Sequence, residues 1–454
     1  MGNIYNFSSD ALLKRIGLSP GKKLLVFFVS AVLVTLPLGY AYNSITIVLF
    51  VLYSVLSAKR DGIYYNRALL LPMLMYLFMA LSLLWSVDCN STFRALSKEA
   101  SLLFIPLAFC FNNRFIRMGR KDILKNFSIA MVLAALFFVG RAVVRYTQTG
   151  NPEVFFYHEL STFSVNAIYL SALFSVPLFY FLTVKNKTWW AYACFIFLFV
   201  VITLLSSKTV IFIDVLLTAT YMLFYSRMPK KARVTVFVAF MASAVALGYY
   251  GKIKERLVEE FTTQATLADG VNNLTVKDAW TKEKFSHNDY FNGVAFRVYQ
   301  GRVFTELAAE DPAMMLTGYG LNASSHKVNE KGTSLNVHPG SGDGINYGYS
   351  LQNFHNQYIE TFADLGIFGF LLLLVLLGIN LKKALQGKDF VHIAFAILMI
   401  ALLLTESFLW RQRGVVFFTV LYCLFNGLAP KGFGKRYEKN PDNGSGRLPG
   451  VTPM

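Results

Sequence analysis

The chain has 454 residues, of which 55% are hydrophobic and 15% are charged, and this composition excludes an ordinary soluble protein. Its formal net charge of +17 would suit a nucleic-acid-binding protein, but basic residues also collect in the cytoplasmic loops of membrane proteins. We therefore predict an all-α polytopic membrane protein, embedded in a lipid bilayer, with no nucleic-acid partner.

Twelve apolar segments follow one another along the chain, and each is a candidate membrane span. The polar stretch MGNIYNFSSD and four basic residues precede the first segment, so we expect it to remain in the protein as a signal anchor. The second and fourth segments are shorter than the ~20 residues of a straight span, so either they borrow polar flanking residues or one is re-entrant. The segments run from about 24 to 42, 44 to 58, 68 to 86, 99 to 112, 127 to 144, 163 to 184, 189 to 206, 209 to 226, 233 to 250, 357 to 380, 390 to 408 and 414 to 430.

The distribution of lysine and arginine predicts the orientation in the membrane. If the N-terminus is cytoplasmic, that side receives the basic head, the tail KGFGKRYEKN and loops such as NNRFIRMGRKDILKN and SRMPKKAR. The short loops on the other side carry few basic residues. Because basic residues favour the cytoplasmic side, we predict that both termini are cytoplasmic.

Four units are predicted along the chain. Residues 1–250 form an N-terminal membrane bundle of about nine spans, and residues 251–354 form one large extracytoplasmic loop between spans nine and ten. Residues 355–430 form a C-terminal unit of three spans, and residues 431–454 form a disordered cytoplasmic tail.

Within the large loop, the composition changes along the sequence. The stretches KIKERLVEEFTTQA and VAFRVYQGRVFTELAAE predict helices at 251–264 and 294–310. Residues 317–350 are rich in Gly, Ser, Asn and Tyr, which predicts a loop with turns.

The stretch FHNQYIETFADLGIFG at 354–369 follows this loop. His355, Ile359, Phe362 and Gly366 recur at intervals of four, three and four residues, which predicts one face of an α-helix. A histidine is therefore expected at the extracytoplasmic mouth of a membrane helix. A lone histidine there is more often a cap or an interface residue, so its neighbours must decide whether it has a chemical role.

The order of residues in this stretch resembles the C-terminal signature of the O-antigen ligase and O-antigen polymerase superfamily. The family has a His-Asn pair, then a Tyr or Leu, then Gly-x-x-Gly on the next membrane helix. In this chain those positions are His355, Asn356, Tyr358, Gly366 and Gly369. As in the family, the stretch follows a large extracytoplasmic loop and precedes the C-terminus by three membrane segments.

Two other stretches are similar to patterns of the same family. FRVYQGRVFTELAAEDPAMMLTGYGLNA matches an arginine, a helix, then a proline and Gly-x-Gly, at Arg297, Pro312, Gly318 and Gly320. LLLTESFLW resembles the family's Thr-Glu-Ser stretch, at Glu406. The resemblance implies a GT-C-like membrane fold of about 12 helices.

The resemblance also implies a reaction, the transfer of a glycan from undecaprenyl diphosphate to an acceptor hydroxyl without a metal ion or other cofactor. His355 would be the general base, because histidine titrates near working pH and a helix N-terminus keeps its ring neutral. Cations would bind the leaving diphosphate, since guanidinium groups match phosphate oxygens. The predicted substrate-binding residues are Arg297, Arg302, Lys208, Asn356, Tyr358, Arg141, Arg145 and Glu406.

Two positions depart from the family pattern. Lys208 stands where the family often has arginine, which keeps the positive charge and loses the bidentate fork. Gly301 replaces an aromatic residue expected about four positions after the upstream arginine. Either Arg297 or Arg302 is therefore a candidate for the functional cation.

Structural roles also explain several of these residues. Arg141 and Arg145 share a helix face at a four-residue spacing, and anchoring to phospholipid headgroups explains them equally well. Glu406 lies near the membrane edge, where ionisable groups are functional candidates, but a plain ion pair with Arg411 is the structural alternative.

Among the family's activities we expect the ligase, which moves glycan onto lipid A-core in the bacterial inner membrane with its active site facing the periplasm. The loop carries the arginine helix followed directly by the His-Asn helix, before three final spans. A polymerase that extends the lipid-linked glycan, or a protein O-oligosaccharyltransferase, would use the same base and cations. A polysaccharide flippase is less favoured, because the chain has no internal repeat.

Overall fold

The computed structural model describes residues 21–58, 66–161, 165–185, 188–226, 272–340, 348–350 and 352–427, with single residues at 231, 234 and 238. The predicted loop helix 251–264 and the predicted tail 431–454 lie outside the described residues, as does the predicted ninth span apart from residues 234 and 238.

Helices coincide with eleven of the twelve predicted apolar segments, so the described chain is mostly helical, as predicted. Four stretches of the described chain are long and apolar enough to cross a membrane, namely Arg67–Leu84, Ile116–Thr149, Lys208–Tyr225 and Gln357–Gly387. The count of about twelve spans remains a prediction. The eleven helices are α2 (Lys22–Val34), α3 (Tyr40–Leu56), α4 (Arg67–Leu81), α6 (Ser101–Phe111), α7 (Asn113–Thr149), α9 (Ala167–Thr183), α10 (Trp189–Leu204), α11 (Lys208–Thr220), α18 (Gln357–Gly387), α19 (Phe390–Leu402) and α20 (Gln412–Asn426).

Shorter elements connect these helices. They are η2 (Ser82–Leu84), α5 (Cys89–Glu99), η3 (Pro152–Phe155), α8 (Tyr157–Ser161), the π-helical turn η4 (Tyr221–Tyr225) and η5 (Phe408–Trp410).

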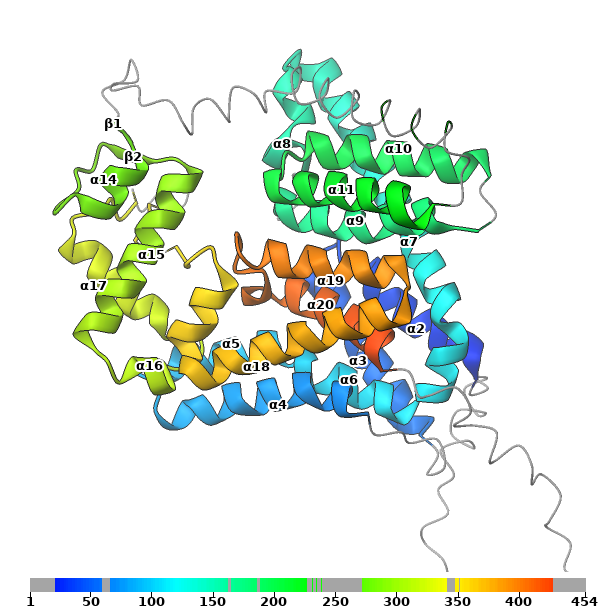
Figure 1. Ribbon diagram of the computed structural model, residues 1–454, viewed down its shortest axis with the longest axis horizontal. Helices are drawn as coiled ribbons and strands as arrows, with labels where there is room; N and C mark the ends of the chain where they lie inside the picture. The colour runs from blue at the N-terminus through cyan, green and yellow to red at the C-terminus, as the bar shows by residue number, and fades with distance from the viewer. Residues whose placement is uncertain are drawn as a thin grey trace, which may run out of the picture.

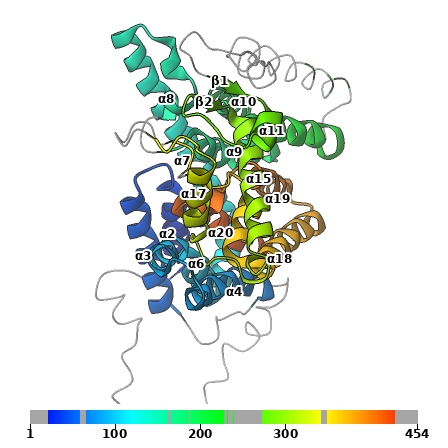
Figure 2. The same ribbon diagram turned by 90° about the vertical axis from the view of Figure 1, so that its left-hand side faces the viewer.

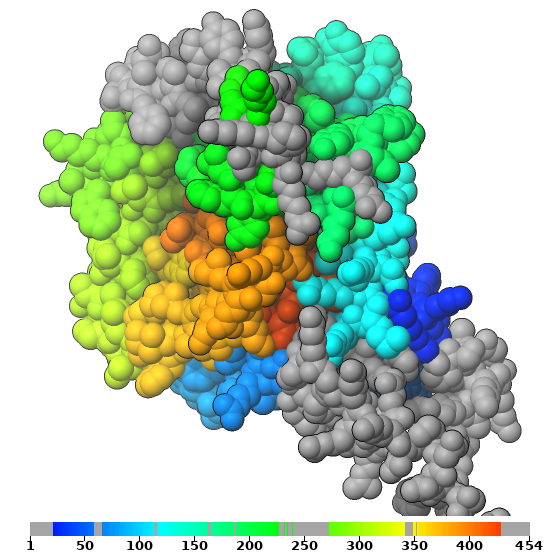
Figure 3. All heavy atoms as spheres, turned by 45° about the vertical axis from the view of Figure 1, so that its right-hand side comes forward, coloured from blue at the N-terminus to red at the C-terminus, as the bar shows by residue number. Residues whose placement is uncertain are grey.

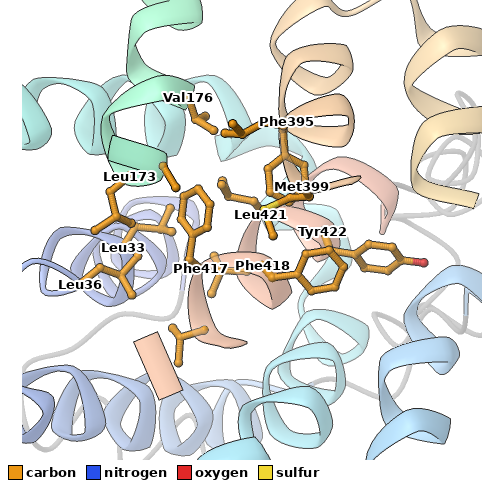
Figure 4. Packing of buried hydrophobic residues seen from close by; sticks show 14 of the residues in the cluster. Leu33, Leu36, Leu173, Val176, Phe395, Met399, Phe417, Phe418, Leu421 and Tyr422 are labelled. Carbon is orange, nitrogen blue, oxygen red and sulfur yellow. The ribbon is translucent and has the colours of Figure 1, made fainter. Parts of the chain in front are cut away.

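The helix α20 lies at the centre of the bundle, with α19, α18, α6 and α2 around it (Figure 1). Every residue of α20 from Arg413 to Asn426 is buried, as expected for a helix that is apolar on all sides. Figure 4 shows Phe417, Phe418 and Leu421 of α20 packed between residues of α2, α9 and α19. By contrast, α18 reaches the molecular surface (Figure 3), where its residue Phe368 is exposed, as a lipid-facing side chain would be.

One predicted cytoplasmic loop is helical. The sequence NNRFIRMGRKDILKN was expected to be a loop, but α7 begins at Asn113 and continues through it. Gly119 allows α2 to pack closely against α7. A Cβ atom at this position would lie 2.3 Å from the Val26 side chain on α2, which is too close for a larger residue. Lys22 of α2 also pairs with Asp122 at 2.8 Å. Packing against α2 therefore makes this charged segment helical.

The described part of the large loop forms a lobe at one end of the bundle (Figure 1), and α15 and α17 lie in front of α20 when viewed from that end (Figure 2). The lobe has its own apolar core around Tyr299 and Phe291. Its elements are the parallel strands β1 (Asn272–Leu274) and β2 (Asp289–Phe291) and the helices α14 (Val276–Thr281), α15 (Gly293–Glu310), α16 (Met314–Thr317) and α17 (Ser324–Ser334).

Within the lobe, the predicted helix 294–310 is confirmed as α15. The prediction that 317–350 is a loop with turns is wrong in part, because Ser324–Ser334 form the helix α17. Val328 and Gly332 on α17 are buried, and a Cβ atom at Gly332 would lie 3.4 Å from the Tyr299 hydroxyl. Burial of this one face against α15 stabilises a helix that its polar composition does not predict.

The lobe joins the bundle where α18 is broken. Gly366, inside α18, has φ 62° and ψ −164°, so the helix is interrupted there. The backbone N–H groups of Tyr319 and Gly320 donate to the carbonyls of Ala363 and Asp364 at 2.9 and 2.8 Å. The Gly-x-Gly segment of the lobe thus satisfies carbonyl groups that the broken helix leaves open.

Candidate active site

His355 precedes α18 by two residues. Its backbone has φ 48°, in the left-handed region. The following residue, Asn356, is the N-cap, and its side chain accepts hydrogen bonds from the N–H groups of Tyr358 and Ile359 at 3.0 and 3.2 Å. The prediction that His355 shares one helical face with Ile359 and Gly366 is therefore wrong, because the helix begins after His355 and breaks at Gly366.

Three segments that are distant in sequence meet at the imidazole of His355. Its Nδ1 lies 3.4 Å from Oε2 of Glu406, in the turn between α19 and η5. The other oxygen of Glu406, Oε1, accepts a hydrogen bond of 3.1 Å from Nη2 of Arg297 on α15. The ring of Phe296 packs edge-on against the imidazole at 5.5 Å between centroids. His355, Glu406 and Arg297 therefore form one connected group, here called the His355 triad.

The triad is closed on one side and open on the other. The Glu406 side chain is 10% exposed, whereas the His355 and Arg297 side chains are 28% and 36% exposed. Nδ1 of His355 faces Glu406, and in the described part of the chain Nε2 makes no hydrogen bond. A substrate hydroxyl can therefore approach the second ring nitrogen.

Arg297 is held firmly by backbone groups as well as by Glu406. Its Nε donates to the Thr405 carbonyl at 3.0 Å, and its Nη1 donates to the Gly293 carbonyl at 2.7 Å. A guanidinium group has five N–H donors, so these two bonds and the one to Glu406 leave two N–H donors of Arg297 for a ligand.

A buried carboxylate behind the triad connects the two segments that carry it. Oε2 of Glu360 accepts a hydrogen bond of 3.0 Å from the N–H of Phe354, the neighbour of His355. The same oxygen accepts a bond of 3.0 Å from the hydroxyl of Ser407, the neighbour of Glu406. Glu360 is 3% exposed. It therefore holds the His355 and Glu406 backbones at a fixed separation.

Arg302, the other candidate arginine, does not join the triad. Five residues along an α-helix correspond to a rotation of about 140°, so Arg302 leaves α15 on another side than Arg297. Its Nε donates to Glu306 at 2.6 Å, and its Nη1 donates to the carbonyl of Lys282 at 2.7 Å. Both contacts lie within the lobe, so the structure gives Arg302 a structural role.

The remaining predicted cations lie on α7 and α11. Lys208 is the first residue of α11, which packs on α9 and α19. Arg145, near the end of α7, donates to the backbone carbonyl of Glu159 at 2.8 Å and pairs with the Glu159 carboxylate. Arg141 lies one turn earlier on α7. The structure therefore does not bring Arg145 to the triad.

Two further predicted residues have structural partners. Asn356 caps α18, as described above. The hydroxyl of Tyr358 donates to the carbonyl of Ile400 on α19 at 3.0 Å. Glu406 pairs with Arg297 and His355, and not with Arg411, whose guanidinium lies 5.9 Å from the ring centre of Tyr169.

Sequence reasoning missed the buried acidic residues near the triad. Glu360 and Asp364 lie one turn apart on α18, and Glu99 lies at the end of α5. All three line one cavity. The sequence ETFAD indicates the pair Glu360 and Asp364, because two carboxyl groups four residues apart lie on one face of an apolar helix and are functional candidates there. No group of three or more His, Cys, Asp or Glu residues in the described chain is arranged to hold a metal ion.

The triad has the arrangement of a general base with an orienting group. A carboxylate at Nδ1 fixes the tautomer of the imidazole and stabilises the imidazolium that forms when Nε2 takes a proton. The neighbouring guanidinium stabilises an anion. No protein-family model and no curated protein sequence matches the chain.

Proposed function

We propose that the protein is a membrane glycosyltransferase of the O-antigen ligase type. It would transfer a glycan from undecaprenyl diphosphate to lipid A-core or another glycan acceptor, with its active site on the periplasmic side of the bacterial inner membrane. The observation that carries this proposal is the 3.4 Å contact between His355 and Glu406, with Arg297 on the same carboxylate. These residues come from the three separate stretches that resemble the family.

In the proposed reaction, Nε2 of His355 takes the proton of the acceptor hydroxyl. The acceptor oxygen then forms a bond to the anomeric carbon of the donor sugar, and the bond from that carbon to the diphosphate oxygen breaks. The bonding electrons leave with undecaprenyl diphosphate. A single displacement of this kind inverts the anomeric configuration.

Charge stabilisation comes from both sides of the proposed reaction. Glu406 would stabilise the imidazolium of His355, and the two remaining N–H donors of Arg297 would bind the departing diphosphate. Arg297 holds Glu406 and the backbone of Thr405 through its other donors, so it stabilises the site before substrate binds. Lys208, by the family resemblance, and Arg141, by its charge near the end of a membrane segment, are further candidate diphosphate ligands.

A deletion strain tests this function most directly in the cell. If the protein is a ligase, the strain accumulates lipid-linked polymer of full length, and the wild-type gene restores lipopolysaccharide while His355→Ala does not. Lipopolysaccharide with a single repeat unit in the deletion strain would indicate a polymerase instead. Normal lipopolysaccharide with unglycosylated protein would indicate a protein O-oligosaccharyltransferase.

A further inference from the structure

A second polar site lies beside the triad, in a cavity between α4, α5, α18 and η5. The carboxyl groups of Glu99, Glu360 and Asp364 line it. All three residues are more than nine-tenths buried, with exposures of 4%, 3% and 4%. The cavity has room for about one or two groups of the size of a water molecule.

The three carboxyl groups differ in their hydrogen bonds. Asp364 accepts from the backbone N–H groups of Asn322 at 2.7 Å and Ser324 at 3.3 Å. Glu360 accepts from Phe354 and Ser407, as described above. Oε2 of Glu99, in contrast, is buried and has no hydrogen-bond partner in the described part of the chain.

Most of the wall beyond Glu99 is apolar. Glu99 lines an adjoining cavity with apolar residues such as Met75, Leu102 and Phe418, and the two uncharged polar residues there bond to each other, with Nε2 of Gln357 donating to the Thr361 hydroxyl at 3.2 Å. A buried acceptor without a partner destabilises the folded protein. A donor that fills the cavity removes this destabilisation.

The charged residues that line the cavity indicate which kind of hydrogen-bond donor would bind there. Lys98 is the single basic residue in the lining, and its Nζ lies 4.9 Å from the ring centre of Trp410. One partly exposed cation faces three buried carboxyl groups. A paired cation stabilises a buried carboxylate, so the cavity favours a positively charged ligand and disfavours a phosphate.

We propose that this cavity binds a primary ammonium group through Glu99, with the carboxyl groups of Glu360 and Asp364 beside it. An ammonium group is about the size of a water molecule, carries one positive charge and presents three N–H donors. Two ligands can provide it, an amino sugar or the ethanolamine headgroup of a bilayer lipid. The proposal does not rest on the proposed glycosyl transfer, because it concerns binding alone.

The first experiment measures binding by thermal unfolding of the full-length protein in detergent micelles at about pH 8, where alkylammonium ions are charged. Methylammonium chloride is expected to raise the Tm saturably, whereas tetramethylammonium chloride, which has no N–H donor, is not. Equal effects of the two salts, an equal effect of sodium chloride, or no effect at all would overturn the proposal.

Variants then assign the effect to the cavity. Glu99→Gln is expected to weaken the methylammonium effect roughly tenfold or more, since it removes one charge-assisted hydrogen bond. Asp364→Asn gives a second test if Glu99→Gln does not fold. Glu283→Gln is the matched control, because Glu283 is exposed in the lobe and its substitution removes the same charge. A full methylammonium effect in both cavity variants would contradict the assignment.

A competition experiment identifies the source of the amine. Glucosamine, compared with N-acetylglucosamine, tests for an amino sugar. Vesicles of phosphatidylethanolamine, compared with phosphatidylcholine, test for a lipid headgroup. Protection by either amine but not by its matched control supports the cavity as an ammonium site, and equal protection by each pair contradicts it.

Discussion

The Nδ1 atom of His355 lies 3.4 Å from Oε2 of Glu406, although about fifty residues separate them in the sequence. The contact requires the start of α18 and the turn after α19 to meet, and Glu360 holds both segments from behind. Arg297, on the lobe helix α15, also pairs with the Glu406 carboxylate. The arrangement of the His355 triad thus depends on how the lobe docks onto the bundle.

Removing the carboxylate at Nδ1 is expected to slow glycosyl transfer without unfolding the protein. Glu406→Gln keeps the shape and the acceptor for Arg297 but loses the charge that stabilises the imidazolium, so we expect a loss of roughly 10²–10⁴-fold in turnover. Single-turnover transfer from lipid-linked glycan measures the loss. Turnover within a few-fold of the wild-type rate would show that Glu406 does not orient the base.

The two arginines of α15 are expected to give different phenotypes. Arg297→Lys loses the geometry that joins Glu406 and Thr405, so transfer should fall while the lobe stays folded. Arg302→Lys breaks the contact with Glu306 and should lower the stability of the lobe with little effect on transfer in the folded protein. Transfer assays and limited proteolysis of the lobe distinguish these outcomes, and the opposite pattern would reverse our assignment.

Glu360 is expected to act as a positioning residue. Glu360→Ala removes the acceptor for Phe354 and Ser407, which should destabilise the site by about 1–3 kcal/mol and reduce transfer. Glu360→Gln keeps an oxygen that accepts both bonds, so it should restore most of the rate. If both variants lose transfer equally, the charge of Glu360 is required in the reaction and the positioning role is wrong.

The break in α18 provides a test of the fold. An alanine Cβ at Gly366 would lie 2.2 Å from the carbonyl oxygen of Leu316, and the backbone there has φ 62°. We expect Gly366→Ala to lower the free energy of unfolding by about 2 kcal/mol or more. Gly378 is the matched control on the same helix, because nothing lies within 4 Å of its Cβ position. Gly378→Ala should be neutral or stabilise by up to ~1 kcal/mol, and similar losses in both variants would contradict the break.

The lobe should become less stable in acid because of Asp289. Burial alone would raise the pKa of Asp289, but hydrogen bonds from Lys282, the backbone of Ser286 and Asn272 outweigh it and lower the pKa. Asp289 therefore stabilises the folded lobe at pH values above about 3.9, its pKa in an unfolded chain, and this stabilisation disappears as the pH falls through the folded value.

Limited proteolysis of the lobe between about pH 3 and pH 6 measures this dependence. The wild-type lobe should lose protection as the pH falls, whereas Asp289→Asn should be less protected at pH 6 and change less with pH. Identical curves for the two proteins would show that Asp289 does not contribute.

The positions of the bundle helices could be predicted from the sequence because each is a continuous apolar run. The start of α7 could not, since its charged residues are typical of a loop and only packing on α2 makes them helical. The helix α17 was missed for the same reason, because its polar sequence hides one small buried face. In both helices, packing against a segment that is distant in sequence stabilises the helical conformation.

The sequence pattern identified His355, Arg297 and Glu406 as separate candidates, but it could not show that they touch. Their contacts depend on the left-handed backbone at His355 and on the docking of the lobe at Gly366, and neither follows from local spacing. Nor could the sequence distinguish Arg297 from Arg302, because that choice depends on which side of α15 faces the bundle.

The most direct test of the proposed function is a transfer assay with purified protein, lipid-linked glycan and lipid A-core in the presence of EDTA. The wild-type protein is predicted to form glycosylated lipid A-core and to release undecaprenyl diphosphate in equal amounts, and His355→Ala to form neither while retaining the wild-type Tm. Undiminished transfer by a folded His355→Ala protein would contradict His355 as the base. Movement of intact lipid-linked glycan across vesicles, with no transfer by the wild-type protein, would contradict the enzyme itself.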